Sequence, residues 1–398
     1  MNKKVLIYFP NQLKEHYGGP YSYLYHLKHG LSGNIESIIF YTNSLSEEGE
    51  NIKKRKSQTF LKKIIKKFIP KYFITNYRAK KWIKEISSTK INIDSDFLNE
   101  FSLIHFHESI DIWRLKELLT KYKGKIIFTP HTPKPYHLEL INDVWNVSKN
   151  EIKPKYLNKI IEIDQIAYSL ADTYIYPCPE SAESTYQLWS DFSNISKNKN
   201  FEYVLTGIKE QITNKTREEI RDSLNIPNNA FVVCFSGRKI PVKGYDLLVE
   251  AANFLLANYP DIYFVIAGKE SSNPPNNKKK WIETGWTDFP QDYMNASDII
   301  IVPNRYTFFD LSVLEALSLG KTLLLSETGG NNYFKKFNSP GIHFHTCNAE
   351  SIIEQVLHIY ELKDKLGKYE NVNKSIFENY FLSSIFAKNI KKIYASIS

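Results

Sequence analysis

The sequence predicts an α/β protein of two doubly wound domains, each with a parallel sheet covered by helices. The chain has 398 residues, which is more than one core of ordinary size holds. Short apolar runs without polar alternation recur along it, and such runs are typical of strands buried on both faces. Segments with helical periodicity separate them, which indicates repeated βα units in each half.

The expected strands are apolar runs that stop at or next to glycine, proline, serine or histidine. They are VLIYF (5–9), LIHF (103–106), KIIFT (125–129), TYIY (173–176), FVVCFSG (231–237), YFVIAG (263–268), DIIIVP (298–303) and TLLLS (322–326). Between two of them, residues 245–259 (YDLLVEAANFLLANY) have the periodicity of a helix. The order of these segments predicts a parallel sheet in each half.

The domain boundary is expected near residues 205–225, which are polar and lack strand character. Within them, Thr216 and Glu219 form a capping-box pattern for a following helix. We therefore expect domains over 1–210 and 211–380, and a C-terminal helix over 381–398 that packs back on the N-terminal domain. Two such sheets leave a cleft at the carboxyl ends of their strands, where open α/β sheets bind ligands.

The composition excludes several classes of protein. With 42% apolar and 24% charged residues the chain is globular rather than disordered. Cys178, Cys234 and Cys347 are too widely spaced for a disulfide framework or a zinc site, which suggests a reducing compartment. The apolar run after Met1 is too short for a signal peptide, and no run of about 18 apolar residues predicts a spanning helix. We expect a cytoplasmic protein.

The net charge of +9 is concentrated in residues 51–85, which hold thirteen Lys or Arg and one acid. In this segment Leu61, Ile64, Ile65, Phe68 and Ile69 share one helical face and lysines occupy the other. Such a helix is typical of binding to anionic lipid. A nucleic-acid arm and a solvated helix packed on its own domain are the other interpretations. The apolar residues favour the membrane, with Lys62, Lys63, Lys66, Lys67 and Phe68 as the binding residues, and no nucleic-acid partner is expected.

Two cations follow the expected strand at 231–237. Arg238 and Lys243 stand in the loop GRKIPVKGYD. At the end of a strand, a planar guanidinium and a point-charge ammonium can hold a diphosphate between them. Two solvated surface cations are the other interpretation.

The stretch NRYTFFDLSVLEALSLGK, residues 304–321, follows the strand at 298–303. Asp310 is a candidate N-cap and Gly320 a candidate C-terminal stop for a helix near 311–319. The N–H groups at the start of this helix would favour an anion in the cleft. Glu315 lies one turn inside, either facing the surface or buried where sugar hydroxyls donate to it.

These motifs, taken in order, resemble the retaining family-four glycosyltransferases of the GT-B fold. The matching positions are Gly237-Arg238, Lys243-Gly244, Asp246, Gly268, Gly285, Tyr293, Ala296, Asp298, Pro303, Phe309, Leu314-Glu315-Ala316, Gly320 and Gly329-Gly330. The first half adds HYGGPYSYLYHL (16–27), LIHFHES (103–109) and FTPHT (128–132), which resemble the family's glycine loop and two strands with histidines. The glycine loop is not GxGxxG, so no nicotinamide site is indicated.

The resemblance implies a role for each matched residue. Arg238 and Lys243 would hold the diphosphate, Glu315 the ribose, and His131 the transferred sugar, although a histidine considered alone is more often part of a core. With Asp310, the implied catalytic residues are His131, Arg238 and Lys243. The implied donor-binding residues are Gly18, Gly19, Gly237, Gly268, Trp286, Thr307, Phe309, Leu311, Ser312 and Glu315. Cations and a helix N-terminus can stabilise a leaving diphosphate, so no metal and no cofactor are expected.

The sequence departs from the family pattern at two positions. The family usually has a glutamate where Thr307 stands and a glycine where Asp310 stands. A carboxylate at the start of a helix would repel a diphosphate bound there. We therefore expect Asp310 to point toward the sugar and to take over part of the missing glutamate's work.

The function that the resemblance implies is transfer of a hexose-type sugar, with retention, from a nucleotide diphosphate donor, most simply a UDP-sugar. The acceptor would be a saccharide or lipid-linked glycan in bacterial-type surface polysaccharide or glycoconjugate synthesis. The N-terminal domain would bind the acceptor and the C-terminal domain the donor, on the inner face of the membrane. The alternatives are a catalytically silent GT-B subunit that binds glycan or supports a partner transferase, and a sugar-nucleotide epimerase.

Overall fold

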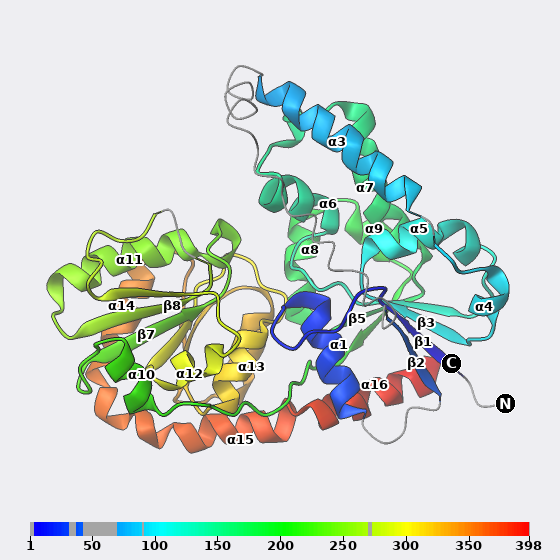
Figure 1. The fold of residues 1–398 in the computed structure, drawn as a ribbon. Coiled ribbons are helices and arrows are strands. Elements are labelled where there is room, and N and C mark those ends of the chain that lie inside the picture. Colours follow the sequence, from blue (N-terminus) through cyan, green and yellow to red (C-terminus); the bar gives the residue numbers. More distant parts are fainter. Residues whose placement is uncertain (1–3, 32–36, 43–69, 90, 270–272, 398) are drawn as a thin grey trace.

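The computed structural model describes residues 4–31, 37–42, 70–89, 91–269 and 273–397. They form two lobes, each with a six-stranded parallel sheet flanked by helices (Figure 1). The prediction of two α/β domains is confirmed. Residues 62–68, where the lipid-binding residues are predicted, lie outside the described part of the chain.

The first sheet has the strand order β2-β1-β3-β4-β5-β6. Its strands are β1 (Val5–Tyr8), β2 (Ile38–Tyr41), β3 (Leu103–Phe106), β4 (Lys125–Phe128), β5 (Thr173–Tyr176) and β6 (Asn200–Tyr203). The helices of this half are α1 (Gly19–Gly30), α3 (Lys71–Ser88), α4 (Ser95–Asn99), α5 (Ser109–Leu119), α6 (Tyr136–Leu138), α7 (Pro154–Leu170), α8 (Glu183–Leu188) and α9 (Phe192–Ser196). Shorter turns are the π-helical η1 (Glu139–Val144) and the 3₁₀ turns η2 (Lys149–Glu151) and η3 (Pro179–Ala182).

The second sheet has the order β12-β11-β10-β7-β8-β9. Its strands are β7 (Phe231–Ser236), β8 (Ile262–Ala267), β9 (Trp281–Gly285), β10 (Ile299–Val302), β11 (Thr322–Ser326) and β12 (Ile342–His345). Its helices are α10 (Arg217–Ser223), α11 (Tyr245–Asn258), α12 (Pro290–Asn295), α13 (Leu311–Ser318), α14 (Ala349–Glu361) and α15 (Glu370–Tyr380). The 3₁₀ turns are η4 (Pro241–Lys243), η5 (Gly329–Phe337) and η6 (Lys363–Lys368).

The strands that the sequence did not predict are β2, β6, β9 and β12, and each lies at an edge of its sheet. The predicted strands are the inner ones, where both faces are covered and the sequence is continuously apolar. At the edges the burial is partial, as in NFEY of β6, which has no buried residue. The apolar-run criterion therefore misses edge strands for a physical reason.

The last helix, α16 (Ser383–Ile397), returns to the first lobe after α15 has run beside the second (Figure 1). Phe386, Ile390 and Tyr394 are buried in the same apolar cluster as Leu24 and Leu27 of α1. The contact is close, because a Cβ on Gly30 of α1 would lie 1.9 Å from the carbonyl oxygen of Ser383. The two ends of the chain thus share one core.

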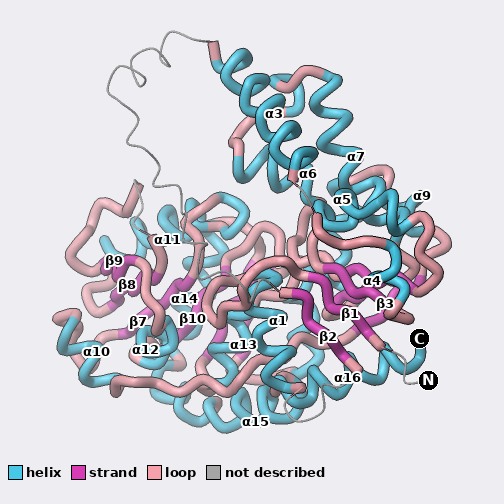
Figure 2. Tube along the Cα trace, turned by 45° about the vertical axis from the view of Figure 1, so that its right-hand side comes forward, coloured by secondary structure: helices cyan, strands magenta, loops and turns pink. Residues whose placement is uncertain are grey.

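Helices α3 and α7 project from the first lobe away from the second sheet (Figures 1 and 2). Trp82 of α3 packs edge-on against Trp145, with ring centroids 5.8 Å apart, in a small apolar cluster of its own. Among the described residues, no helix has the length and apolar character needed to cross a bilayer.

The capping box predicted at Thr216 is confirmed. The Thr216 hydroxyl accepts from the Glu219 backbone N–H at 3.1 Å, and the Glu219 carboxylate accepts from the Thr216 N–H at 2.8 Å. The helix that it begins, α10, carries the fully buried Arg221. That guanidinium donates to the carboxylate of Asp298 and to the carbonyl oxygen of Ala296, both at 2.9 Å. It thereby joins α10 to the start of β10.

We expect Arg221→Met to lower the free energy of unfolding by ~3–5 kcal/mol, because it breaks a buried ion pair with Asp298 and leaves the carbonyl groups of Ala296, Asn228 and Ala230 without the guanidinium as their donor. Arg217, which donates to the same Asp298 at 2.6 Å from a partly exposed position, offers a matched control. Its replacement by Met should cost ~1 kcal/mol or less. Urea denaturation of the full chain measures both, and equal effects would contradict the structural role of Arg221.

Candidate functional site

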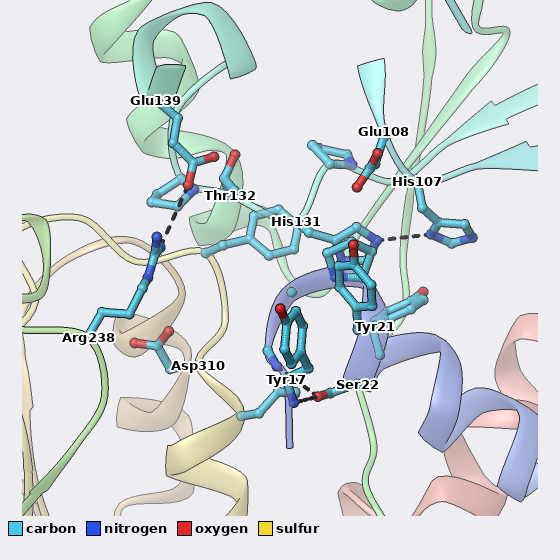
Figure 3. Close-up of a pocket in the computed structure, with 18 of the residues that line it drawn as sticks. Tyr17, Tyr21, Ser22, His107, Glu108, His131, Thr132, Glu139, Arg238 and Asp310 are labelled. Carbon is cyan, nitrogen blue, oxygen red and sulfur yellow. Dashed lines mark hydrogen bonds and ion pairs between the residues drawn. The ribbon is translucent and has the colours of Figure 1, made fainter. Parts of the chain in front are cut away.

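A cavity of about 1640 Å³ lies between the two sheets and is lined by residues of both domains. The carboxyl ends of β3, β4, β7, β8 and β10 lead into it, as the topology of parallel sheets requires. Its walls carry the side chains shown in Figure 3. Every residue predicted to be catalytic or donor-binding lines this cavity, although they come from positions as far apart as Gly18 and Glu315.

Two glycines shape the C-terminal wall where the cations stand. Gly244 has φ +64°, and a Cβ there would lie 1.8 Å from the carbonyl oxygen of Pro303, so the loop with Lys243 presses against the end of β10. Gly268 has φ +131°, and a Cβ there would lie 2.3 Å from the carbonyl oxygen of Gly237. Close backbone approach therefore fixes where Arg238 and Lys243 enter the cavity.

Lys243 and Asp310 form an ion pair, with the ammonium 2.6 Å from Oδ1 of the carboxylate. The other oxygen, Oδ2, accepts from the side-chain amide of Asn304. Asp310 occupies the N-cap position of α13, but its side chain makes no capping hydrogen bond. The predicted N-cap position is confirmed, but the carboxylate turns to the ammonium of Lys243 and does not cap the helix. A sugar hydroxyl at this place would have to share an oxygen that is already in use.

Arg238 reaches across the cavity to the N-terminal domain. Its guanidinium lies 3.7 Å from the carboxylate of Glu139 in η1, and its side chain is 63% exposed (Figure 3). Burial raises the pKa of Glu139, and the charge of Arg238 opposes that shift. Glu139 belongs to no motif in the sequence and was not predicted. The two predicted diphosphate-binding cations, Arg238 and Lys243, are thus each paired with a carboxylate.

Glu315 lies on the face of α13 that lines the cavity, and it is half-buried. Within the described part of the chain its carboxylate has no hydrogen-bond donor. Burial, followed by the charges of Glu15 and Asp310, raises its pKa to about 7. This placement suits a carboxylate that accepts hydrogen bonds from a ligand better than it suits a solvated surface residue.

Thr307 lines the same cavity as Glu315 and is buried. Its hydroxyl has no hydrogen-bond partner among the described residues. Trp286, by contrast, is 58% exposed at the cavity. The cavity therefore offers a small neutral donor and acceptor at residue 307, and a large aromatic face at residue 286.

His131 and His107 share a hydrogen bond of 2.9 Å between Nε2 of the first and Nδ1 of the second. Burial lowers the pKa of both rings, that of His131 to about 3, so both are neutral and one proton lies between them. The other nitrogen of His107, Nε2, is buried without a partner in the described structure. An orphaned N–H is rarer than an orphaned lone pair, which favours a proton on Nδ1 of His107. His131 then carries its own proton on Nδ1, as a hydrogen-bond donor.

The glycine loop before α1 forms the floor on the N-terminal side. Gly18 and Gly19 have φ of +75° and +53°, in the left-handed region that favours glycine. The Ser22 hydroxyl accepts from the backbone N–H groups of Tyr17 and Gly18, at 3.2 and 3.0 Å. Ser22 was not predicted as a site residue, although its place in the first turn of α1 is a signal that could have found it.

The remaining N-terminal wall consists of residues that the sequence did not single out as a site. They include Tyr8, Tyr41, Glu108, Asp111, Arg114 and Tyr136. Glu108 falls within the matched segment 103–109, whereas the others lie in no recognisable motif. Their proximity follows from the sheet order, which places β1 between β2 and β3.

Comparison with known proteins identifies the C-terminal part of the chain. A family model described as "Glycosyl transferases group 1" matches residues 216–375. An Escherichia coli protein named UDP-Gal:alpha-D-GlcNAc-diphosphoundecaprenol alpha-1,3-galactosyltransferase is 28% identical over 35% of this chain and 39% of its own length. An Acholeplasma laidlawii protein named alpha-monoglucosyldiacylglycerol synthase is 19% identical over 83% of this chain and 82% of its own length.

Solved structures resemble the chain over nearly its whole length. Sucrose-phosphate synthase from Thermosynechococcus elongatus superposes with a TM-score of 0.65 at 15% identity, covering 99% of this chain and 98% of the other. Anabaena Alr3699/HepE in complex with UDP gives a TM-score of 0.61 at 13% identity, covering 99% and 100%. At such identities the likeness establishes the fold.

Among the Escherichia coli and Salmonella typhimurium transferases that match it, the chain spans between 39% and 50% of the relative's length. The family match covers the second sheet, Lys243, Asp310 and the whole of α13. It also includes Gly268, Thr307 and Glu315, which line the cavity. Residues 216–375 therefore resemble the glycosyl transferases group 1 family, in a chain with the two-domain GT-B fold.

Proposed function

We propose that the chain is a retaining glycosyltransferase that moves a hexose-type sugar from a UDP-sugar to a saccharide or lipid-linked glycan. The proposal rests on the residues that lie together on the C-terminal wall of the cavity. There, Arg238, Lys243, the N-terminus of α13 and the half-buried Glu315 lie together within the segment that matches the transferase family. Cations and helix N–H groups suit a diphosphate, and an unpaired carboxylate suits ribose hydroxyls.

The size of the cavity supports a reaction between two substrates. Sites for a single drug-sized ligand enclose about 300–1000 Å³. The cavity here, at about 1640 Å³, has room for a nucleotide-sugar on the C-terminal wall and an acceptor on the N-terminal wall. A protein that only bound a nucleotide-sugar would not need the second wall.

The charged pairs suggest how the donor is received. A diphosphate entering the site competes with Asp310 for Lys243 and with Glu139 for Arg238. Its two phosphates gain two cations and the positive end of α13, which stabilise the negative charge that develops when the glycosidic bond breaks. We propose that no metal or other cofactor is needed, because protein groups supply this charge.

Retention requires the acceptor to arrive on the face that the diphosphate leaves. In the proposed reaction the leaving phosphate oxygen takes the proton of the acceptor hydroxyl, so no protein base is required. His131 is neutral over the physiological range, since burial lowers its pKa to about 3. Its proposed part is to donate a hydrogen bond to the transferred sugar through Nδ1.

The choice of UDP and of a lipid-linked acceptor rests on the relatives. The name of the Escherichia coli relative gives UDP-Gal as its donor and a diphosphoundecaprenol-linked sugar as its acceptor. The Acholeplasma laidlawii relative is named for a glycolipid, and Anabaena HepE has been solved with UDP. We extend these chemistries to this chain, and place its work in the synthesis of surface polysaccharide or glycoconjugate.

Helix α3 supports a place on the inner face of the membrane. Tyr72, Phe73 and Tyr77 are 41%, 60% and 71% exposed on the part of the first lobe that projects from the body (Figure 2). Lys71, Lys80, Lys81 and Lys84 accompany them on the same helix. Exposed aromatic rings beside lysines suit the interface of an anionic membrane. We propose that α3 and residues 62–68 together bind lipid.

The central test is nucleotide release by the purified chain with a panel of UDP-, GDP- and ADP-sugars. Release with a UDP-sugar is expected, and Arg238→Ala and Lys243→Ala should each lower it by a factor on the order of 10². Lys279→Ala, at an exposed position of the same domain, is the control. EDTA should leave the rate within about twofold, because protein cations bear the charge.

Failure of this test has two distinct forms. Binding of UDP without release from any donor indicates a silent subunit, and conversion of a donor to its isomer without acceptor indicates an epimerase.

Asp310→Ala tests whether Asp310 helps to hold the sugar. If Asp310→Ala leaves turnover and the preference among donor sugars unchanged while Glu315→Ala abolishes nucleotide release, Asp310 has no part in holding the sugar.

The raised pKa of Glu315 predicts pH-dependent donor binding. With a pKa of about 7, the carboxylate that accepts ribose hydroxyls is mostly ionised at pH 8 and mostly protonated at pH 6. Affinity for UDP-glucose, whose diphosphate diester does not titrate in this range, should fall roughly tenfold from pH 8 to pH 6. Glu315→Gln should bind weakly and equally at both. Calorimetry measures the affinity at each pH. If Glu315→Gln loses affinity between pH 8 and pH 6 as the unmodified chain does, a group other than Glu315 titrates.

Vesicle co-sedimentation tests the membrane surface. The chain should bind phosphatidylglycerol vesicles and not phosphatidylcholine vesicles, because the lysines require anionic lipid. Replacing both Phe73 and Tyr77 with Ser should weaken binding several-fold, at about 1 kcal/mol or more per buried ring. Phe254→Ser, at an exposed site on α11 of the other domain, is the control. Equal binding to both kinds of vesicle, or binding to neither, would contradict the proposed lipid-binding surface.

A further inference from the structure

The N-terminal wall of the cavity contains a polar hollow that the donor chemistry does not use. We define the hollow by Tyr8, Tyr41, Glu108, Asp111 and Arg114, all of which line the cavity. Tyr8 and Tyr41 end the neighbouring strands β1 and β2, and the three charged residues lie at or near the start of α5. The hollow thus faces the donor wall from the opposite domain.

Asp111 is the buried group at its floor. Its side chain is 2% exposed, and Oδ2 has no hydrogen-bond partner among the described residues. Its other oxygen, Oδ1, lies 3.6 Å from the nearest guanidinium nitrogen of Arg114, which is an ion pair without a close hydrogen bond. Nε of Arg114 is also buried and unpartnered in the described structure. Buried polar atoms are seldom left without partners, so both groups point to a ligand that supplies them.

The charge of the hollow decides what kind of ligand it takes. Burial, followed by the charge of Glu108, raises the pKa of Asp111 to about 8, and burial also raises the pKa of Glu108. With Asp111 protonated, Glu108 and Arg114 cancel, and with Asp111 ionised the hollow carries one net negative charge. Neither state has a spare positive charge for an anionic ligand.

Two other cations that line the cavity, Lys134 and Arg238, are already engaged. Lys134 donates to both oxygens of Asp143, at 2.9 and 3.0 Å. Arg238 faces Glu139 at 3.7 Å and is the proposed partner of the diphosphate. An acidic group brought into the hollow would therefore meet carboxylates, and it would have to compete for Lys134 and Arg238.

Aromatic rings line the rest of the hollow. Tyr8 and Tyr41 stack with their centroids 5.1 Å apart and their planes at 6°, and Tyr41 is only half-buried. Tyr21 and Tyr136 line the same cavity, and the charge of Glu108 raises the pKa of each after burial does. Rings with a few fixed polar groups form the kind of site that binds a small hydroxyl-rich molecule.

We infer that this hollow holds an uncharged sugar residue of the acceptor, with its hydroxyls on Asp111, Glu108 and Arg114 and one face against Tyr41, and that it excludes sugars bearing carboxylate or phosphate. The assignment to an acceptor rests on the proposed transferase function. The preference for an uncharged sugar rests on the hollow alone.

The test measures binding, so that it does not depend on turnover. Saturation-transfer NMR with saturating UDP compares p-nitrophenyl glucoside, galactoside, N-acetylglucosaminide and glucuronide, which share one aryl group. At least one neutral glycoside should bind, and the glucuronide should bind roughly tenfold more weakly than that glycoside, because its carboxylate meets like charge. Glu108→Gln should reduce the difference in affinity between the neutral glycoside and the glucuronide, by improving glucuronide binding. Asp111→Asn should weaken binding of the neutral glycoside roughly fivefold.

Controls separate this inference from the proposed donor site. Glu117→Gln removes the same charge from an exposed position on α5 and should change nothing. UDP affinity by calorimetry should stay within about twofold in every variant, since the donor wall is untouched. If Asp111→Asn does not fold, the glycoside binding of Tyr41→Ala and Glu108→Gln tests the inference in its place. The inference is overturned if glucuronide binds as tightly as the neutral glycosides, or if these variants leave glycoside binding unchanged. If the chain binds neutral glycosides selectively but releases no nucleotide, that result contradicts only the proposed transferase function.

Discussion

Parallel strands all end at the same edge of a sheet, and this constraint decides where the protein has its chemistry. In each domain the strand ends, the loops that follow them and the first turns of the next helices share one edge. The cavity between the two edges gathers residues from Tyr8 to Glu315. Arg238, His131 and Asp310 are close in space because each follows an inner strand.

A second constraint is the cost of holding charge in an enclosed space. The cavity contains cations and carboxylates in nearly equal supply, and most of them pair, as Lys243 does with Asp310. Among the described residues, Glu315 on one wall and Glu108 on the other have no ion-pair partner, and Asp111 has only the 3.6 Å contact with Arg114 and one oxygen without a partner. The pKa of all three carboxyl groups is raised. Since unpaired carboxylates are costly to bury, their positions mark where hydroxyl groups of ligands complete the structure.

How much the sequence could predict follows from the same physics. Inner strands are apolar on both faces and can be recognised, whereas β6 and the other edge strands are half-exposed and cannot. The donor wall lies on one contiguous segment, so its motifs keep their order and spacing. The N-terminal wall is assembled from β1, β2, α5 and η1, which are far apart in sequence. Glu139 and Asp111 therefore gave no local signal, and the pairing of Asp310 with Lys243 depends on a contact between two loops.

The return of α16 to the first lobe has a consequence for how the chain is made. The helix α16 is synthesised after all the strands of both sheets, yet Phe386, Ile390 and Tyr394 complete the apolar cluster around α1. Tyr394 also binds Nδ1 of His105 at 2.7 Å, and the His105 ring lies beside His107, the partner of His131. The elements of the second domain are all synthesised once α15 has emerged, whereas the core of the first lacks these three residues until α16 follows. The first half of the cavity therefore depends on a helix that is synthesised after the second sheet, and a chain truncated before Ser383 would leave that half incomplete.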